Sequence, residues 1–179
     1  MKSIKSTSLI AILVLLIIAA KAQKIIPQID STTHKITYQG IVQVTGNKDA
    51  LYDKGLNWLA IAFKSSNDVI QIKDKESGKI VGKWVLQPAE DKIGFVSATI
   101  TLLFKDGRYK YIITNLYYQG TQGSMGFAPW PLEDDPGIWK VNMTKGAQHR
   151  VKDGTYAQIM ALVEDLKKYM STDNQTNNF

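Results

Sequence analysis

The recurrence of an apolar residue at every second position between 96 and 104 is the sequence feature that most constrains the fold. Every second position is apolar, and these positions are Val96, Ala98, Ile100, Leu102 and Phe104. The positions between them include the polar residues Ser97, Thr99 and Thr101. Because successive side chains of a strand point to opposite sides, this period predicts a sheet with one covered face and one solvated face.

Turn signals divide the chain into further strands. The predicted strands cover residues 35–44, 68–74, 79–87, 94–104 and 108–118. The second and third of these are joined by a short connection ending in Gly78, and the last two are joined by a turn containing Gly107. Glycine supplies the positive φ that tight hairpin turns require. The middle of the chain therefore reads as consecutive antiparallel hairpins.

Two amphipathic helices are predicted from apolar residues spaced three and four positions apart. The first begins near Lys48, after a cap at Asn47 or Thr45, and ends near Phe63. Gly55 in its middle indicates either a close approach to the sheet or a plain helix defect. The apolar stripe of the last helix comprises Tyr156, Ile159, Met160, Val163, Leu166, Tyr169 and Met170. The order strand, helix, four strands, helix predicts an α+β fold with the helices packed on one face of an antiparallel sheet.

The N-terminus predicts export. Lys2 and Lys5 precede twelve consecutive apolar residues, Leu9 to Ala20, and small residues then lead to an expected cleavage between Ala22 and Gln23. Twelve helical residues span only about 18 Å, whereas a membrane-spanning helix must cross about 30 Å of hydrocarbon. We therefore expect a periplasmic or secreted protein with no stable membrane anchor after cleavage.

The expected domain organisation follows from these boundaries. Residues 1–22 are a signal peptide, 23–34 a flexible lead-in, 35–170 a single α+β domain, and 171–179 a disordered polar tail. The chain has no cysteine, so disulfides and thiolate metal ligands are excluded. Removal of Lys2, Lys5 and Lys21 with the signal leaves 19 basic against 16 acidic residues. This small, scattered excess gives no reason to expect a nucleic-acid partner.

Several segments resemble a known family. They are Leu51-Tyr52, Trp58, Phe63-Lys64, residues 67–71, residues 74–83 and residues 104–111. The chain is similar here to a secreted bacterial domain of unknown function with a TBP-like fold. The resemblance covers residues 35–118 well and the last helix in pattern only, and it implies a β-α-β(4)-α order. It implies no activity, and the DNA binding of TATA-binding proteins is not expected of an exported protein because fold does not dictate function.

No catalytic or metal-binding motif is recognisable. His34 and His149 are isolated, so no metal site and no cofactor are expected. Glu133-Asp134-Asp135 could suggest calcium or acid/base chemistry, but consecutive carboxylates point in different directions, so a solvated turn is favoured. The chain is therefore not expected to be an enzyme.

The segment 119–150 is the exceptional region, because it is long, rich in glycine and proline, and aromatic. Three states are considered for it: a flap packed over the sheet or core, a binding surface, or a mobile loop. Residues 138–143 could form a short edge strand that packs Trp139 with Val141 and Met143. Trp130, between Pro129 and Pro131, is expected to be exposed.

The favoured function is a non-catalytic binding module of the cell envelope, with an envelope protein, a glycan or a small ligand as its partner. Aromatic residues dominate many binding surfaces. The candidate binding residues are Tyr109, Tyr111, Tyr117, Tyr118 and Trp130. Ordinary sheet packing would explain the tyrosines equally well. The alternatives are a hydrolase using Asp134 and Asp135, and a purely structural envelope component.

Overall fold

The computed structural model describes residues 27–63, 69–87, 94–120 and 128–172. The expected signal peptide and residues 173–179 of the expected tail lie outside the described residues. In the described part of the chain, no helix is long and apolar enough to cross a membrane.

A seven-stranded antiparallel sheet forms one layer of the molecule. Its strands are β1 (Gln28–Ile29), β2 (Ile36–Gln43), β3 (Ile70–Asp74), β4 (Lys79–Leu86), β5 (Gly94–Lys105), β6 (Arg108–Gly120) and β7 (Trp130–Pro131). Their spatial order is β1-β2-β6-β5-β4-β3, and β7 pairs with β6. All five predicted strands are present. Gly78 and Gly107 take positive φ values of 67° and 73° in the two hairpin turns, as predicted.

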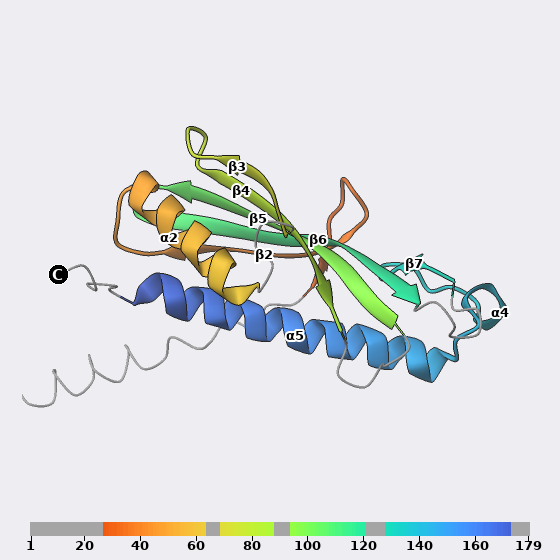
Figure 1. Cartoon of the computed structure of the whole chain (residues 1–179). Coiled ribbons are helices and arrows are strands. Elements are labelled where there is room, and N and C mark those ends of the chain that lie inside the picture. The colour runs from red at the N-terminus through yellow and green to blue at the C-terminus, as the bar shows by residue number, and fades with distance from the viewer. Residues whose placement is uncertain (1–26, 64–68, 88–93, 121–127, 173–179) are drawn as a thin grey trace, which may run out of the picture.

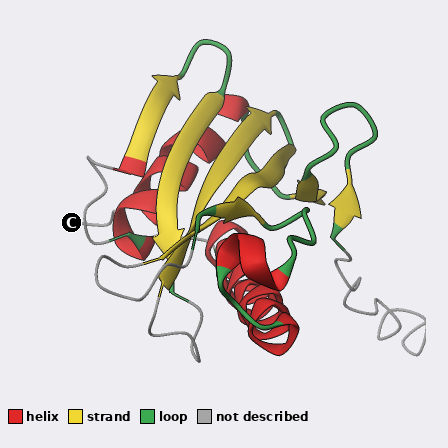
Figure 2. Ribbon diagram, turned by 90° about the vertical axis from the view of Figure 1, so that its right-hand side faces the viewer, coloured by secondary structure: helices red, strands yellow, loops and turns green. Residues whose placement is uncertain are grey.

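The helices α2 (Lys48–Ala62) and α5 (Lys145–Ser171) form the second layer, on one face of the sheet (Figure 1). Figure 2 shows the same arrangement from the side, with α5 seen nearly along its axis beneath the strands. The predicted α+β class, an antiparallel sheet with the helices on one face, is confirmed. A short helix, α4 (Ile138–Val141), precedes α5.

Helix α2 begins where the sequence predicts. The side-chain oxygen of Asn47 accepts a hydrogen bond from the Ala50 amide at 2.8 Å and so satisfies one of the free donors of the first turn. A Cβ on Gly55 would lie 2.3 Å from Cζ of Phe104 on β5. Of the two interpretations of Gly55, the close approach to the sheet is therefore correct.

Helix α5 is longer than the apolar stripe predicts. It begins at Lys145 after a Thr144 cap, eleven residues before Tyr156, the first residue of the predicted stripe, and contains 27 residues. The extra turns are held by tertiary contacts, because Gln148 and Val151 are buried. The side-chain amide of Gln148 also donates to the Met143 carbonyl at 3.0 Å. Packing outweighs the weak intrinsic helix propensity of this segment.

Two other segments differ from the sequence-based predictions. Within the lead-in, Gln28–Ile29 pairs with β2, and the Asp30 carboxylate accepts a 2.7 Å hydrogen bond from the Thr33 amide, so this part has defined structure. The predicted edge strand over 138–143 is wrong, because residues 138–141 are helical. The helix ends at Asn142, which adopts a left-handed conformation with φ of 50°.

The core lies between the sheet and the two long helices. The alternating set of β5, from Val96 to Phe104, is at most 2% exposed, as predicted. Trp58 of α2 packs in the same core, and its indole nitrogen donates to Asp165 of α5 at 2.8 Å. Buried Leu166 and Val163 belong to the predicted stripe of α5. The covered face of the sheet is therefore fully used for packing.

Candidate functional site

Four of the five predicted binding aromatics lie in the core. Tyr109, Tyr111, Tyr118 and Trp130 are at most 2% exposed, whereas Tyr117 is 39% exposed. Tyr109, Tyr111 and Tyr118 occupy the helix-covered side of β6, so the alternative interpretation, ordinary sheet packing, is correct for these three residues. The four buried side chains are not available as surface anchors, and of the five candidates only Tyr117 is substantially exposed to solvent.

The expected exposure of Trp130 is wrong for a specific reason. Trp130 pairs with Tyr118 through β7, and the two rings lie 5.9 Å apart between centroids. The Lys152 ammonium of α5 lies 5.5 Å from the centroid of the indole ring. With Leu132, Val141 and Met143 also buried, the described part of the segment 119–150 is a packed flap. The environment of the Trp139 side chain and residues 121–127 lie outside the described residues.

A bulge in β6 decides which tyrosine faces the solvent. Before it the buried residues are odd-numbered, as at Tyr111, and after it they are even-numbered, as at Tyr118. The pairing of β5 with β6 shifts register between Ser97 and Thr99, and Asn115 opposite has a φ of 56°. One extra residue in a strand exchanges the faces of all residues beyond it. Asparagine tolerates this left-handed conformation better than most residues. Asn115 is therefore the one feature of the sequence that is consistent with a bulge at this place.

The second face of the sheet has no described helix over it, and we call it the open face. It combines exposed aliphatic side chains with cations. Ile41, Val85 and Ile72 are 61%, 58% and 45% exposed. The strand register places five basic side chains on this face: Lys79, Lys83, Lys105, Arg108 and Lys110. Asp74, opposite Lys79, is the single carboxylate that the described strands place there. This concentration cannot be recognised in the sequence, because the cations are distributed over three strands.

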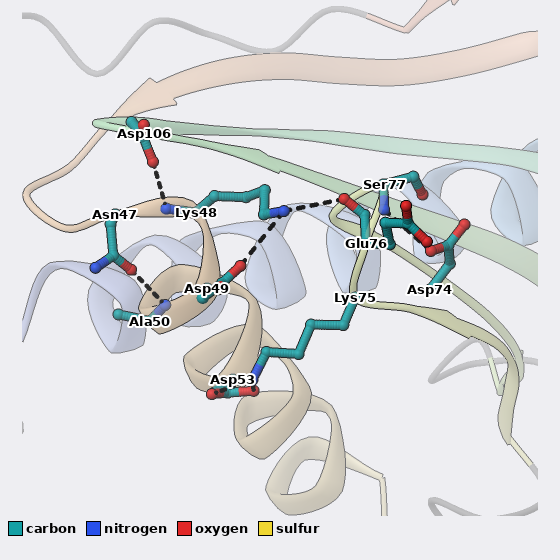
Figure 3. A network of polar contacts seen from close by, with 10 residues as sticks. All are labelled: Asn47, Lys48, Asp49, Ala50, Asp53, Asp74, Lys75, Glu76, Ser77 and Asp106. Carbon is teal, nitrogen blue, oxygen red and sulfur yellow. Dashed lines mark hydrogen bonds and ion pairs between the residues drawn. The ribbon is translucent and has the colours of Figure 1, made fainter.

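One end of the open face is fixed by a polar network around the start of α2 (Figure 3). The Lys48 amide donates to Oδ1 of Asp106 in the β5–β6 turn at 2.7 Å. The Lys48 ammonium donates to the Glu76 carbonyl in the β3–β4 turn at 2.9 Å. The ion pair of Lys75 with Asp53, at 2.8 Å, joins the same turn to α2. Both hairpin turns are thereby attached to one helix.

The carboxylate of Asp74 makes a hydrogen bond in the adjacent β3–β4 turn. Its Oδ1 accepts a hydrogen bond from the Ser77 amide at 3.0 Å. This backbone hydrogen bond, more than the nearby charge of Lys79, lowers the pKa of the Asp74 carboxyl. Asp74 is thus a turn-forming residue.

The open face carries a pocket beside these turns. Its volume is about 270 Å³, and it is lined by Ile41, Leu103, Lys105, Arg108, Tyr109 and Lys110. Lys110 pairs with Ile41 on β2 and with Leu103 on β5, so one cation stands between two aliphatic side chains. Lys105 and Arg108 are directly opposite each other at the turn end of the hairpin. Tyr109 was a predicted binding residue, but its ring lies in the core.

The acidic turn at 133–135 is separate from this pocket. Asp134 and Asp135 are exposed. The Asp135 carboxylate accepts a hydrogen bond from the Lys145 ammonium, and this bond is the main reason that the pKa of Asp135 is lowered. Lys152 donates to the Asp134 carbonyl at 2.8 Å. The turn is therefore bound to α5 by lysines. Across the described ranges, no group of three or more His, Asp or Glu side chains gathers in a way that could hold a metal.

Comparison with known proteins agrees with the fold. Residues 38–119 match the model of a family described as a domain of unknown function (DUF4468) with TBP-like fold, so the predicted resemblance to that family is confirmed. No curated protein matches the chain. Export stays a prediction.

Solved structures that superpose on the chain include two bacterial proteins. A TBP-like protein from Parabacteroides distasonis superposes with a TM-score of 0.62 at 14% identity, covering 79% of this chain and 96% of that one. A DUF4468 family protein from Bacteroides ovatus gives a TM-score of 0.58 at 17% identity, covering 84% and 95%. At these identities the likeness concerns the fold alone.

Proposed function

We propose that this chain, whose residues 38–119 match a family with a TBP-like fold, is an exported, non-catalytic binding module that holds its partner on the open face of the sheet. The fold itself carries no activity to transfer, because one fold hosts many functions. The proposal therefore rests on the surface of this chain.

The observation that carries the proposal is the uncovered face of the sheet. Ile41 and Val85 each leave more than half of their surface in solvent, in strands whose opposite side is packed against helices. Ile41 lies across β6 from Leu103, and Ile72 pairs with Val81, so part of this aliphatic surface is grouped and has cations beside it. Grouped apolar side chains are typical of interaction surfaces, whereas isolated exposed apolar residues are ordinary. A partner that covers this face would remove that aliphatic surface from water.

The acidic turn supports a binding module over a hydrolase. A hydrolase that uses Asp134 and Asp135 needs two carboxylates converging in a cleft. Here both side chains are exposed, and the Asp135 carboxylate is engaged by Lys145. The contacts of the turn are those of a structural element.

Export is the second half of the proposal, and it rests on the N-terminal sequence. Cleavage between Ala22 and Gln23 would release the domain into the periplasm or the medium. Intact-mass measurement of the protein recovered from envelope and culture fractions tests this half. A cytoplasmic chain that retains Leu9 to Ala20 would contradict it.

Photo-crosslinking in cells tests the binding half. A photoreactive amino acid in place of Val85 samples the open face, and the same group in place of Ile61 samples α2 on the other side. The two positions are matched, since they are 58% and 69% exposed. We expect discrete adducts from position 85 and none from position 61. Equal adducts at both positions would argue against a binding role for the open face, and adducts at neither position would argue against a macromolecular partner there.

A further inference from the structure

The pocket on the open face combines the two halves of an amphiphile-binding site. Its apolar part is supplied by Ile41 and Leu103, which lie on either side of β6. A volume of about 270 Å³ lies just below the range of about 300 to 1,000 Å³ that is common for ligand pockets. The pocket therefore has room for a short hydrocarbon body and not for a large cofactor.

The polar part of the pocket is cationic. Lys105, Arg108 and Lys110 all line it. Among the described residues, no carboxylate forms an ion pair with any of the three. Asp106 stands between two of them in sequence, but one of its carboxylate oxygens accepts the Lys48 amide. The cations are thus held on a fixed hairpin, with their charges unpaired by the described part of the protein.

We propose that this pocket binds a small amphiphilic carboxylate, with the hydrocarbon body on Ile41 and Leu103 and the carboxylate on Arg108 and its neighbouring lysines. Arginine presents parallel N–H donors that match the two oxygens of a carboxylate. This inference rests on the proposed function, because it names the ligand class of the same open face.

Charge argues against the obvious alternative occupant, a second copy of the chain. Two open faces brought together would oppose the five basic side chains of each copy, with one carboxylate per copy to compensate. Like charges brought together in an interface are unfavourable. An occupant with negative charge has no such cost.

Titration of the isotope-labelled full chain with octanoate, followed by amide NMR spectra, tests the proposal. Octylamine has the tail without the negative charge, and acetate has the charge without the tail. We expect saturable shifts with octanoate, centred on β2, β5 and β6 around the pocket, and no saturable shifts there with the other two. Equal binding of acetate or of octylamine, or no saturable binding of octanoate, would overturn the proposal.

Two matched pairs of variants locate the site. Arg108→Glu should weaken octanoate binding about tenfold or more, because a charge-assisted contact is lost. Lys73→Glu makes the same charge change on β3, opposite Ile80 of the covered face, and should leave the affinity unchanged. Ile41→Thr should weaken binding, whereas Ile29→Thr, a comparably exposed isoleucine on β1 outside the pocket lining, should not.

The spectra also report folding, so a variant that unfolds is recognised and replaced by its milder form, such as Arg108→Gln. Equal losses in Arg108→Glu and Lys73→Glu would assign the effect to overall charge and refute the pocket.

The ligand proposal and the broader proposed function can be refuted separately. Crosslinks from position 85 without octanoate binding would refute only the ligand class, and the absence of both would refute the binding role of the open face.

Discussion

The two faces of the sheet differ in solvent exposure and in residue type. On the covered face, Ile100 and Leu102 are at most 1% exposed, whereas Ile41 on the open face is 61% exposed. Aromatic residues gather on the covered face, and cations gather on the open one. The comparison teaches that a tyrosine-rich strand does not by itself indicate a binding surface. In this chain the large rings build the core, and aliphatic and basic side chains form the candidate site.

The largest expected effect concerns Trp130, which the sequence places on the surface and the structure places in the core. Trp130→Ala should lower the free energy of unfolding by about 3 to 5 kcal/mol, because it leaves a large cavity beside Tyr118. Chemical denaturation monitored by circular dichroism measures the change. A loss below about 1 kcal/mol would indicate that Trp130 is exposed, and would contradict the difference between the two faces.

Leu102 and Leu103 sharpen the comparison because they are neighbours on β5 that point to opposite faces. Leu102 is 0% exposed, and Leu103 is half-buried in the open pocket. Leu102→Ala should cost about 2 to 5 kcal/mol, and Leu103→Ala less than half as much, because its surroundings are already hydrated. Parallel urea denaturation of both variants decides the point. Equal losses would show that the open face is packed as tightly as the covered one.

Alkaline pH should lower the free energy of unfolding through Tyr38, which is buried on the covered face. Burial is the main cause that raises the pKa of Tyr38 from 10.0 to about 12, and the charge of Tyr156 adds to it. The folded protein therefore holds the phenol proton more tightly than the unfolded chain does, so the stability is complete below pH 10 and falls between pH 10 and 12.

At about 1.4 kcal/mol per pKa unit, the loss is on the order of 3 kcal/mol. Denaturation at a series of alkaline pH values, for the parent chain and for Tyr38→Phe, measures it. The variant should lose stability less steeply over this interval. Identical slopes would mean that the phenol of Tyr38 is already accessible to solvent in the folded protein.

Gly55→Ala tests how closely α2 approaches the covered face. Alanine favours a helix by about 1 kcal/mol, but its Cβ would lie 2.3 Å from the Phe104 ring. Overpacking of about 1 to 3 kcal/mol should exceed that gain, so the net effect is a loss of about 1 kcal/mol. Gly146→Ala is the control. Its Cβ would meet nothing nearer than the Arg150 guanidinium at 3.7 Å, so it should stabilise the protein. Stabilisation by both substitutions would contradict the close contact.

The smallest effects are expected on the open face. Ile41→Thr and Val85→Thr should change the free energy of unfolding by no more than about 0.5 kcal/mol, because both side chains are largely solvated. Thermal and chemical denaturation of the two variants check this. A loss above about 2 kcal/mol at either position would indicate that the face is covered within the protein itself.

Regular elements were predictable because their signals are local. The alternation in β5, the cap at Asn47 and the turns at Gly78 and Gly107 each depend on residues close in sequence. The candidate site was not predictable in the same way. Ile41, Leu103 and Arg108 come from three strands, and the register of those strands brings them together.

The sequence by itself determined the α+β class, the order of the main elements and the existence of one covered face, since periodicity and turn chemistry act over a few residues. The tertiary structure alone decided which aromatics lie inside. The bulge at Asn115 exchanges the faces of Tyr117 and Tyr118, and pairing of β7 with β6 brings Trp130 under Lys152. It also decided that five scattered cations share one surface. Both outcomes depend on the register between strands. Contacts between residues distant in sequence determine that register, and local residue spacing does not.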